Sequence, residues 1–443
     1  MTTTKNNEHK NIKVPNKQEQ NQTCLDAAER EGLRPKGNIP NLRFPEFQEE
    51  WEKCKLGTLT AKVGSGSTPK GGNTVYTSTG HCFVRSQNVG MGYLILDDVA
   101  HINDGIHQKH KATELKEDDV LLNITGASIG RTAIATKEIE GGNVNQHVCI
   151  IRANSKVSPK FLCNYIQTKK IQNYIQSLQT GGSREGLNFE QIRSFPISLP
   201  NIAEQNKIAQ LLDKLNERIA TQNKIIDKLQ SLIKGMGDNL LDNPLWEKTY
   251  LRSFMQFFPT NSLSWEQLSY KEGAIRNLHY GLIHGLQTRG INSASLPMIK
   301  NEAIPKQYTL CQVGDVAFAD ASEDTGEIAK SVEFVDTIEG DTICGLHTIH
   351  GRDIKNRTVV GFKGFAFNSR YFHNQIKRLA QGTKVFSITA NNLSSCYVYL
   401  PDLETQKAIV KLLKAYEEKL LVSKRLLEHY EKQKQYLLRQ MFI

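Results

Sequence analysis

The sequence predicts an α+β fold that occurs twice in one chain. We expect two mixed α/β domains, each followed by a long helix, with the two helices paired as an antiparallel coiled coil in a pseudo-twofold repeat. Leu199-Pro200 recurs as Leu400-Pro401, 201 residues later, and Trp51-Glu52-Lys53 recurs as Trp246-Glu247-Lys248, 195 residues later. Solenoid repeats are only about 20–50 residues long, so a period near 200 residues indicates duplication of a whole module.

The predicted elements follow one another in a simple order. Residues 1–40 are rich in Asn, Gln, Lys and Glu and lack periodicity, so we predict a polar, disordered extension in which Cys24–Arg30 is a candidate short helix. The remaining boundaries place a first domain over 41–200, a central helix over 201–245, a second domain over 246–400 and a C-terminal helix over 401–443.

Short apolar runs bounded by turn-forming residues predict the secondary structure of the two domains. Val120–Ile124 and Val148–Ile151 are rich in branched residues and predict strands of the first domain. Phe161–Leu178 has apolar residues at helical spacing and predicts one helix. Val313–Phe318 is a strand candidate of the second domain that aligns with Glu117–Leu122, so the duplication includes the domains as well as the helices.

The two long helices are predicted from matched apolar stripes with steps of three and four residues. The predicted seam of the first consists of Ile208, Leu212, Leu215, Ile219, Gln222, Ile226 and Leu229. The seam of the second, 201 residues later, consists of Ile409, Leu413, Tyr416, Leu420, Ser423, Leu427 and Tyr430. Such a stripe often packs on its own domain, but two matched stripes of this length favour mutual packing.

Both seams become polar at the same step, Gln222 and Ser423. Only a few residues near Asp242-Asn243-Pro244 connect the first helix to the second domain, which is consistent with antiparallel helices whose polar steps meet and fix the register. Gly235 and Gly237 favour fraying near the end of the first helix, because glycine costs about 1 kcal/mol relative to alanine there.

Composition narrows the class of protein. The formal net charge is +10 and the isoelectric point is about 9.0, which suggests a polyanionic partner such as nucleic acid. The eight cysteines include no Cys-x-x-Cys pair, so we expect a reduced, cytoplasmic protein without a zinc or redox motif. No long apolar run or apolar leader is visible, so we expect no membrane span and no secretion signal.

Catalytic motifs are scarce. Neither a P-loop nor a His-Glu-x-x-His pattern occurs. Gly126-Ala127-Ser128-Ile129-Gly130 matches the nucleophile elbow of hydrolases, but a helix should follow it, and Arg131–Ala135 is better interpreted as a strand after a hairpin turn. His147 and His347 recur 200 residues apart without companions at metal-ligand spacing, so the default interpretation is a shared structural hydrogen bond, and no metal site is predicted.

With the duplication established, residues 41–443 resemble a specificity subunit of type I restriction-modification systems. The first-half motifs are Asn38–Phe47 before Trp51-Glu52, Asp119-Val120-Leu121 with Gly126 and Gly130, Asn145-Gln146-His147, Gly182-Ser183-Arg184 with Leu187-Asn188, and Leu199-Pro200 with Glu204-Gln205. The second-half motifs are Arg276–Gly281 with Ile283-His284, Gly314-Asp315-Val316, Gly382-Thr383-Lys384, and Leu400-Pro401 with Gln406. Residues 1–37 have no counterpart in the resemblance.

The resemblance implies a non-catalytic subunit with two target-recognition domains, each reading half of a bipartite double-stranded DNA site. It also implies antiparallel helices on which two methyltransferase subunits dock to methylate adenine at N6, and two restriction/translocase subunits that join for restriction. S-adenosylmethionine, ATP and Mg are then expected on the partner subunits, and no cofactor on this chain. The alternatives are a two-headed protein-interaction scaffold that does not bind DNA, and a hydrolase built on Gly126–Gly130.

Candidate DNA-binding residues are those with side chains suited to base edges or phosphates in predicted loops. In the first domain they are Ser67, Lys70, Arg85, Gln87, Asn88, Lys109, Lys111, Ser183 and Arg184. In the second they are Arg276, Asn277, His279, Tyr280, His284, Gln287, Arg289 and Lys384. For any single member of this set, a solvated surface role is the simpler interpretation.

Overall fold

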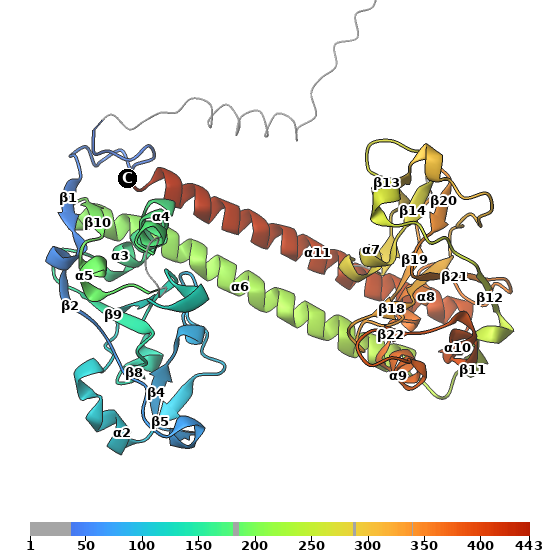
Figure 1. The fold of residues 1–443 in the computed structure, drawn as a ribbon, viewed down its shortest axis with the longest axis horizontal. Coiled ribbons are helices and arrows are strands. Elements are labelled where there is room, and N and C mark those ends of the chain that lie inside the picture. Colours follow the sequence, from blue (N-terminus) through green and yellow to red (C-terminus); the bar gives the residue numbers. More distant parts are fainter. Residues whose placement is uncertain (1–36, 180–185, 287–288, 339) are drawn as a thin grey trace, which may run out of the picture. The chain divides into compact units, whose positions relative to one another are not determined.

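A computed structural model describes residues 37–179, 186–286, 289–338 and 340–443, which form two compact units. Unit 1 comprises Met1–Ile219 and His429–Ile443, and unit 2 comprises Ala220–Glu428. The model confirms the predicted fold class, two mixed α/β domains with two long helices (Figure 1). The predicted disorder of residues 1–36 and the candidate helix Cys24–Arg30 lie outside the described residues.

Unit 1 is built on two four-stranded sheets, ordered β2-β9-β6-β7 and β3-β5-β4-β8, and a separate antiparallel pair, β1-β10. The strands are β1 (Glu52–Lys55), β2 (Thr60–Ser65), β3 (Tyr76–Thr77), β4 (His81–Val84), β5 (Ala100–Ile102), β6 (Val120–Asn123), β7 (Thr132–Ile134), β8 (Asn143–Val144), β9 (Val148–Ala153) and β10 (Pro196–Leu199). The helices are α2 (Asp104–Lys109), α3 (Pro159–Ile166), α4 (Lys169–Ser177), α5 (Phe189–Arg193) and the start of α6 (Ile202–Leu241).

Unit 2 repeats this plan with a five-stranded sheet, β12-β21-β17-β19-β15, a four-stranded sheet, β13-β16-β14-β20, and the pairs β11-β23 and β18-β22. The strands are β11 (Glu247–Tyr250), β12 (Met255–Phe258), β13 (Leu268–Ser269), β14 (Arg276–Leu278), β15 (Gly290–Ile291), β16 (Met298–Ile299), β17 (Val316–Ala319), β18 (Ala321–Ser322), β19 (Ser331–Phe334), β20 (Thr342–Cys344), β21 (Thr348–Asp353), β22 (Phe386–Ser387) and β23 (Tyr397–Leu400). The helices are α7 (Tyr280–Gly285), α8 (Phe362–Ala366), α9 (Arg370–Leu379), α10 (Ala390–Ser395) and α11 (Leu403–Gln440).

The duplication extends to the strand register. Glu52 pairs with Leu199 in β1-β10, and Glu247 pairs with Leu400 in β11-β23. The central sheets match as well, since Leu121 of β6 faces Ile150 of β9 as Ala317 of β17 faces His350 of β21. The predicted strands at Val120, Val148 and Val316 are therefore confirmed, although β17 begins at Val316 because Gly314 and Asp315 form the preceding turn.

A buried glutamine fixes the start of each long helix to its own domain. Gln205 Nε2 donates to the carbonyl of Pro200 at 2.8 Å, and Gln205 Oε1 accepts from the amide of Ser158 at 2.8 Å. Gln406 makes the equivalent bonds to Pro401 at 3.0 Å and from Val359 at 3.0 Å. A buried amide left without partners is costly. Each glutamine therefore favours the helix direction in which both of its hydrogen bonds to the domain are made.

Two details of the predicted helices need correction. The predicted helix Phe161–Leu178 is two helices, because Thr168 ends the first and caps α4 by accepting a hydrogen bond from the amide of Ile171. The predicted fraying at Gly235 and Gly237 does not occur, since α6 continues to Leu241. Leu241 is buried in the core of unit 2, and this packing outweighs the low helix propensity of the two glycines.

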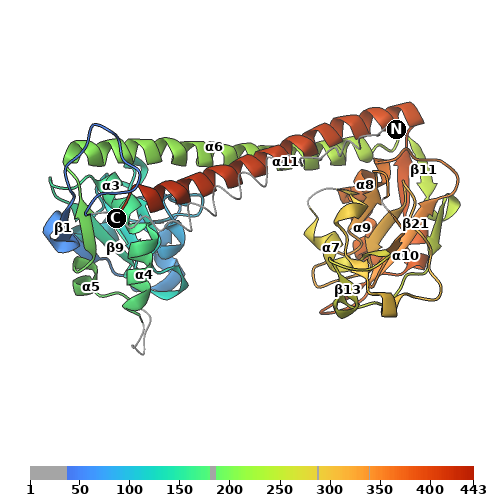
Figure 2. The same cartoon turned by 90° about the horizontal axis from the view of Figure 1, so that it is seen from above.

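The long helices pack against each other in both units, and they lie side by side in both views (Figures 1 and 2). In unit 1 the start of α6, at Ile208 and Leu212, shares a core with the end of α11, at Leu437 and Leu438. In unit 2 the end of α6 shares a core with the start of α11. The pairing is therefore antiparallel within each unit, and every predicted seam residue from Ile208 to Leu229 and from Ile409 to Tyr430 is buried or half-buried.

The two polar steps of the seam meet in unit 2. Both residues are buried, and Gln222 Nε2 donates to the backbone carbonyl of Ser423 at 3.1 Å. The contact joins a side chain to the backbone and does not use the Ser423 hydroxyl. Gln222 is therefore the residue that sets the register at this step, and Ser423 supplies a small side chain beside it.

Replacing both polar residues, Gln222→Leu with Ser423→Leu, should stabilise the chain while loosening the register of the helices. Leucine at both positions extends the apolar seam, and replacing buried polar groups by apolar ones is commonly neutral to stabilising, here by about 1–2 kcal/mol. Urea unfolding of the variant and the parent measures the difference. The substitution Gln222→Ala is the control, since it removes the amide without filling the space, and a lower stability for the double leucine variant would contradict an apolar seam.

Among the described residues, no helix combines the length and apolar character needed to cross a membrane.

Candidate nucleic-acid interface

Polar side chains of unit 1 meet where β6 ends and β9 begins. Thr68, on the loop after β2, donates its backbone amide to Gln146 Oε1 at 3.0 Å. Gln146 Nε2 lies 3.0 Å from His147 Nε2, and His147 Nδ1 lies 2.6 Å from Thr125 Oγ1. These four residues, the unit 1 cluster, present amide, hydroxyl and imidazole groups of the kinds that recognise base edges.

The loop after β2 is held close to the sheet by Gly66. A Cβ atom at this position would lie 1.7 Å from the carbonyl oxygen of Val144, so only glycine allows the backbone this close. Gln146 also fixes this loop by accepting from the amide and the hydroxyl of Thr68, which places Thr68 within the unit 1 cluster.

Unit 2 places different residues at the equivalent strand ends. His347, the counterpart of His147, lies with its Nδ1 3.0 Å from Asp320 Oδ1, on the residue that follows β17. The Tyr280 ring meets the His347 ring edge-on at 5.2 Å between centroids. His279 stacks between Tyr280, at 4.7 Å, and the exposed Trp265, at 4.5 Å. We call these five residues the unit 2 cluster.

Electrostatics and backbone strain mark the unit 2 cluster as a constrained site. Burial, with a smaller contribution from His347, lowers the pKa of His279, so the neutral ring is favoured. His347 has φ of 53°, in the left-handed region that non-glycine residues rarely adopt. A strained histidine held by a carboxylate is pre-positioned, as residues of binding sites often are.

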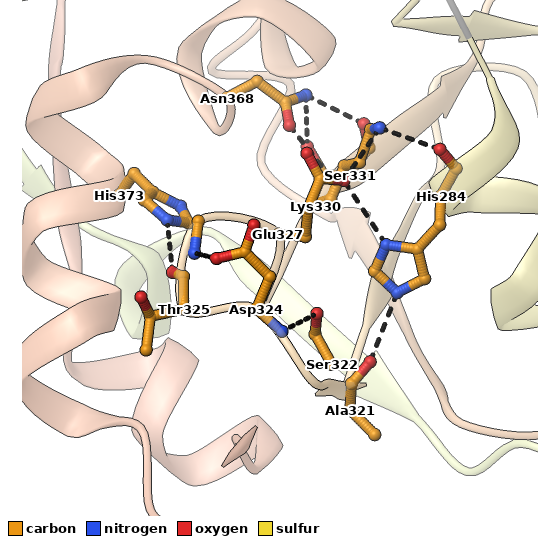
Figure 3. Close-up of polar contacts among 11 residues, drawn as sticks. His284, Ala321, Ser322, Asp324, Thr325, Glu327, Lys330, Ser331, Asn368 and His373 are labelled. Atoms are coloured by element: carbon orange, nitrogen blue, oxygen red, sulfur yellow. Dashed lines mark hydrogen bonds and ion pairs between the residues drawn. The ribbon is translucent and has the colours of Figure 1, made fainter. Parts of the chain in front are cut away.

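Next to this cluster, unit 2 contains a cavity of about 600 Å³ with a basic lining. Five Lys and Arg side chains and two carboxylates surround it: Lys234, Arg289, Lys330, Arg370, Lys377, Asp238 and Glu327. Figure 3 shows Lys330 donating to the backbone carbonyl of His284 at 3.1 Å and to Glu327 at 2.9 Å. The excess of positive charge suits this cavity to a phosphate group.

The structure brings only some of the predicted first-domain residues together. Arg85 and Gln87 converge on Asp98, with Gln87 Nε2 3.1 Å from its carboxylate. Ser67, Lys70, Lys109 and Lys111 are exposed, and Lys111 is paired with Glu114. Asn88 needs correction as a DNA contact, because it is 1% exposed and its amide is used within the loop, accepting from Arg85 N and donating to Ile95 O.

The predicted second-domain residues separate into surface and structural positions. Tyr280 of the unit 2 cluster is half-buried, as is His284, which contacts Glu327 of the cavity lining, and Lys384 is exposed. Asn277 needs correction as a DNA contact, because it is fully buried and accepts from Asn261 Nδ2. Arg276 and Arg289 stay predictions. Arg276 donates to the carbonyls of Ala294 and Leu296, and Arg289 lines the basic cavity while forming a 2.6 Å ion pair with Glu417 of α11. His279 is also buried, so it supports its neighbours' rings. Ser183, Arg184 and Gln287 lie outside the described residues.

Sequence reasoning missed the residues that the strand ends bring together. Thr68, Thr125 and Gln146 were not selected, and His147 and His347 were given only a structural role. Their recurrence 200 residues apart was the available signal. Asp320 and Trp265 gave no sequence signal, because their importance depends on which strand end lies beside which loop.

The hydrolase motif is a hairpin, as the sequence suggested. Gly126–Ser128 forms a single turn of 3₁₀ helix, η5, and the chain continues into β7, which pairs antiparallel with β6. A nucleophile elbow needs a helix at this point. Among the described residues, His147 contacts the hydroxyl of Thr125.

Comparison with known proteins identifies the protein family. Residues 48–231 and 345–431 match the family model described as type I restriction modification DNA specificity domain. The type I restriction enzyme MjaVIII specificity subunit of Methanocaldococcus jannaschii is 24% identical over 416 residues, covering 89% of this chain and 91% of that protein.

Solved structures share the fold. The S subunit of the type I restriction-modification system from M. genitalium superposes with a TM-score of 0.57 at 14% identity, over 91% of this chain and 99% of that one. A chain from a study of complex assembly and conformational transition in a type I R-M system gives a TM-score of 0.52 at 15% identity, over 90% and 98% of the two chains.

Proposed function

Because the chain belongs to the family of type I restriction-modification DNA specificity domains, we propose that each of its two units recognises one half of a bipartite DNA site. One observation supports this proposal above the others. The scaffold is repeated in register, whereas the partners of its equivalent histidines differ: His147 of unit 1 contacts Thr125 and Gln146, and His347 of unit 2 contacts Asp320 and Tyr280. One scaffold with two side-chain sets is what recognition of two different half-sites requires.

The proposed chemistry of recognition divides into two parts. The clusters supply donors and acceptors for base edges, and basic residues supply phosphate contacts that hold the domain in position. The +10 net charge and the cavity around Lys330 favour the phosphate contacts. The chain then needs no catalytic residue of its own, and methyl transfer and cleavage are performed by partner subunits.

The helices supply the proposed docking surface for those partners. Outside the buried stripe, the surfaces of α6 and α11 are mostly polar. They also expose large apolar residues: Leu211, Ile225, Leu232, Leu412, Val422 and Leu426. Exposed apolar residues that recur along two helices are typical of protein interfaces. We infer that two methyltransferase subunits, which use S-adenosylmethionine, and two restriction subunits, which use ATP and Mg, assemble on this chain.

The proposal predicts that variants of the two clusters affect different halves of one DNA motif. N6-methyladenine is mapped across the genome in cells that express the parent, Gln146→Ala or Tyr280→Ala. We expect Gln146→Ala to relax base preference only in one half-site and Tyr280→Ala only in the other. A good base contact contributes about 1–3 kcal/mol, which corresponds to about a 5- to 150-fold loss of discrimination.

Lys53→Ala is the matched control, because Lys53 is exposed on the separate β1-β10 pair. It should leave both halves of the motif unchanged. Cells without the chain should lose the methylated motif entirely. If Tyr280→Ala altered both halves, recognition by separate units would be wrong. If binding of the assembled complex to DNA did not fall with rising salt, the proposed phosphate contacts would be wrong.

A further inference from the structure

Unit 2 contains a buried group of metal-ligating side chains that lies outside the unit 2 cluster. The ligand atoms of Cys311, Cys344 and His350 lie within 4.8 Å of one another, and all three residues are buried. The two sulfur atoms are 3.6 Å apart. Two thiolates bound to one tetrahedral Zn²⁺, each at about 2.3 Å, lie about 3.8 Å apart, so the observed spacing is close to that of a zinc site.

The imidazole of the group has a carboxylate partner, as metal-ligating imidazoles usually have. His350 Nε2 lies 2.7 Å from Asp315 Oδ2, and Asp315 is also fixed by Arg352 through two bonds of 2.8 and 2.7 Å. A proton on Nε2 that is donated to a carboxylate leaves the lone pair on Nδ1 for a metal ion. The carboxylate therefore selects the tautomer that can act as a ligand.

The duplication provides an independent observation. Leu115 N bonds to Gly142 O as Cys311 N bonds to Thr342 O, so these positions are equivalent. The other equivalences follow from Asn145 N bonding to Val84 O as Gly345 N bonds to Leu278 O, and from the β6-β9 and β17-β21 registers. The unit 1 residues at the three positions are all apolar and share one buried cluster: Leu115, Val144 and Ile150.

Unit 2 thus replaces three neighbouring core residues by Cys, Cys and His at once. One further change accompanies them. Thr342 stands where unit 1 has a glycine, and its buried hydroxyl has no hydrogen-bond partner among the described residues. Thr342 is two residues from Cys344 on β20, so the two side chains leave the same face of the strand. The orphaned hydroxyl is suited to hold a water molecule at the site.

A cavity adjoins the group. A cavity of about 290 Å³ is bounded by Cys344 together with Pro259, Thr260, Asn261, Gln307, Tyr308, Thr309 and Ile343. A cavity of this size admits water molecules and a hydrated cation. Cys344 belongs both to the lining of this cavity and to the metal-ligating group.

We propose that Cys311, Cys344 and His350 bind one Zn²⁺ ion, with a water molecule as the fourth ligand, and that this ion stabilises unit 2. Binding converts both thiols to thiolates and releases two protons to solvent. The two thiolates neutralise the charge of the ion, and His350 remains neutral, so the buried site has no net charge. The wide spacing of the three residues, 33 and 6 positions apart along the chain, explains why no zinc motif is visible in the sequence.

The test measures metal binding by the tag-free full-length chain, reduced and stripped with a chelator. Equilibrium dialysis against Zn²⁺ followed by elemental analysis should give about one ion per chain. Substitution with Co²⁺ should produce a thiolate-to-cobalt charge-transfer band, and Zn²⁺ should raise the melting temperature of unit 2. A DNA-binding defect is not needed for this result, so the experiment is independent of the proposed function.

The equivalent residues of unit 1 also suggest a variant without the proposed metal ligands. Cys311→Leu, Cys344→Val and His350→Ile together install the apolar set of unit 1, which maintains a packed core. This triple variant should lose the ion, the cobalt band and the zinc-dependent rise in melting temperature. Cys396→Ala, at a buried thiol outside the group, should retain all three. Absence of stoichiometric zinc in the parent, equal binding by the triple variant, or a Cys311–Cys344 disulfide that forms without bound metal would each overturn the proposal.

Discussion

Trp51→Ala should lower the free energy of unfolding of unit 1 by about 3–5 kcal/mol, the usual cost of truncating a buried large aromatic side chain to alanine. Trp51 is 1% exposed. Its ring meets Phe161 at 5.9 Å and Phe442 at 6.4 Å, both edge-on, and its indole nitrogen lies 3.4 Å from Glu204 Oε1. Truncation leaves a cavity at the point where the domain, α6 and the segment after α11 meet.

The repeat provides the control for this prediction. Trp246 occupies the same sequence motif as Trp51, but it is only half-buried at the edge of the unit 2 core. Trp246→Ala should therefore cost about 1 kcal/mol, because little enclosed volume is lost. Hydrogen exchange followed by mass spectrometry assigns the change to one unit. Equal losses of protection for the two variants would show that the two tryptophans are equivalent.

Lys363→Met should destabilise unit 2 by about 3–5 kcal/mol, because it leaves a buried carboxylate without its counter-charge. Lys363 and Glu333 are 2% and 0% exposed in their side chains, and their charged atoms are 3.0 Å apart. Glu333 also accepts from the amides of Gly361 and Gly364 at 2.9 and 2.8 Å. Chemical unfolding monitored in unit 2 measures the effect.

The loss should depend on pH in a definite direction. Burial raises the pKa of the Glu333 carboxyl, against the lowering effect of Lys363 and the two amides, and removing Lys363 raises it further. A raised native pKa gives stability that is complete below the unfolded pKa, about 4.3, and is lost as the pH rises through the native value. The defect of Lys363→Met should therefore shrink towards acidic pH.

The double variant Lys363→Met with Glu333→Gln separates the charge from the packing. It should recover much of the stability that Lys363→Met loses at neutral pH, since glutamine still accepts from one of the two amides. Lys411→Met, at an exposed position of α11, should have little effect at any pH. A pH-independent defect in Lys363→Met would show that the loss arises from packing alone.

The sequence was sufficient for the architecture where it contained long-range repetition. The Leu-Pro pairs and the matched stripes predict two modules and two paired helices, because their spacing reflects a period that only whole-module duplication produces. The residues of the seam follow for the same reason, since 3.6-residue periodicity is a local consequence of helix geometry. The break at Thr168 was not predicted, because the apolar spacing continues across it while a single hydroxyl caps the next helix.

The candidate site was less predictable for physical reasons. Selecting Arg, Lys, Asn and Gln by type cannot separate Gln87, which is exposed, from Asn88, which is buried one residue later. Asn277 shows the same limit, because its amide serves the packing between β14 and the segment around Asn261. The strand-end clusters depend on sheet order, which joins residues distant in sequence. The proposed zinc ligands, Cys311, Cys344 and His350, are recognised by comparing equivalent positions of the two units. Those equivalences come from the strand register.

The shared core of unit 1 also affects how this protein is made. Asn41 donates to Gln440 across 399 positions of sequence, and Phe442 packs on Trp51. On the ribosome, the residues around Trp51 emerge long before Leu437–Phe442 exist, so unit 1 has an unfilled core during most of translation. Unit 2, whose described core residues span Leu241 to Leu413, can be completed earlier. The first unit to leave the ribosome is therefore the last to finish folding, and chaperone demand should be concentrated on it.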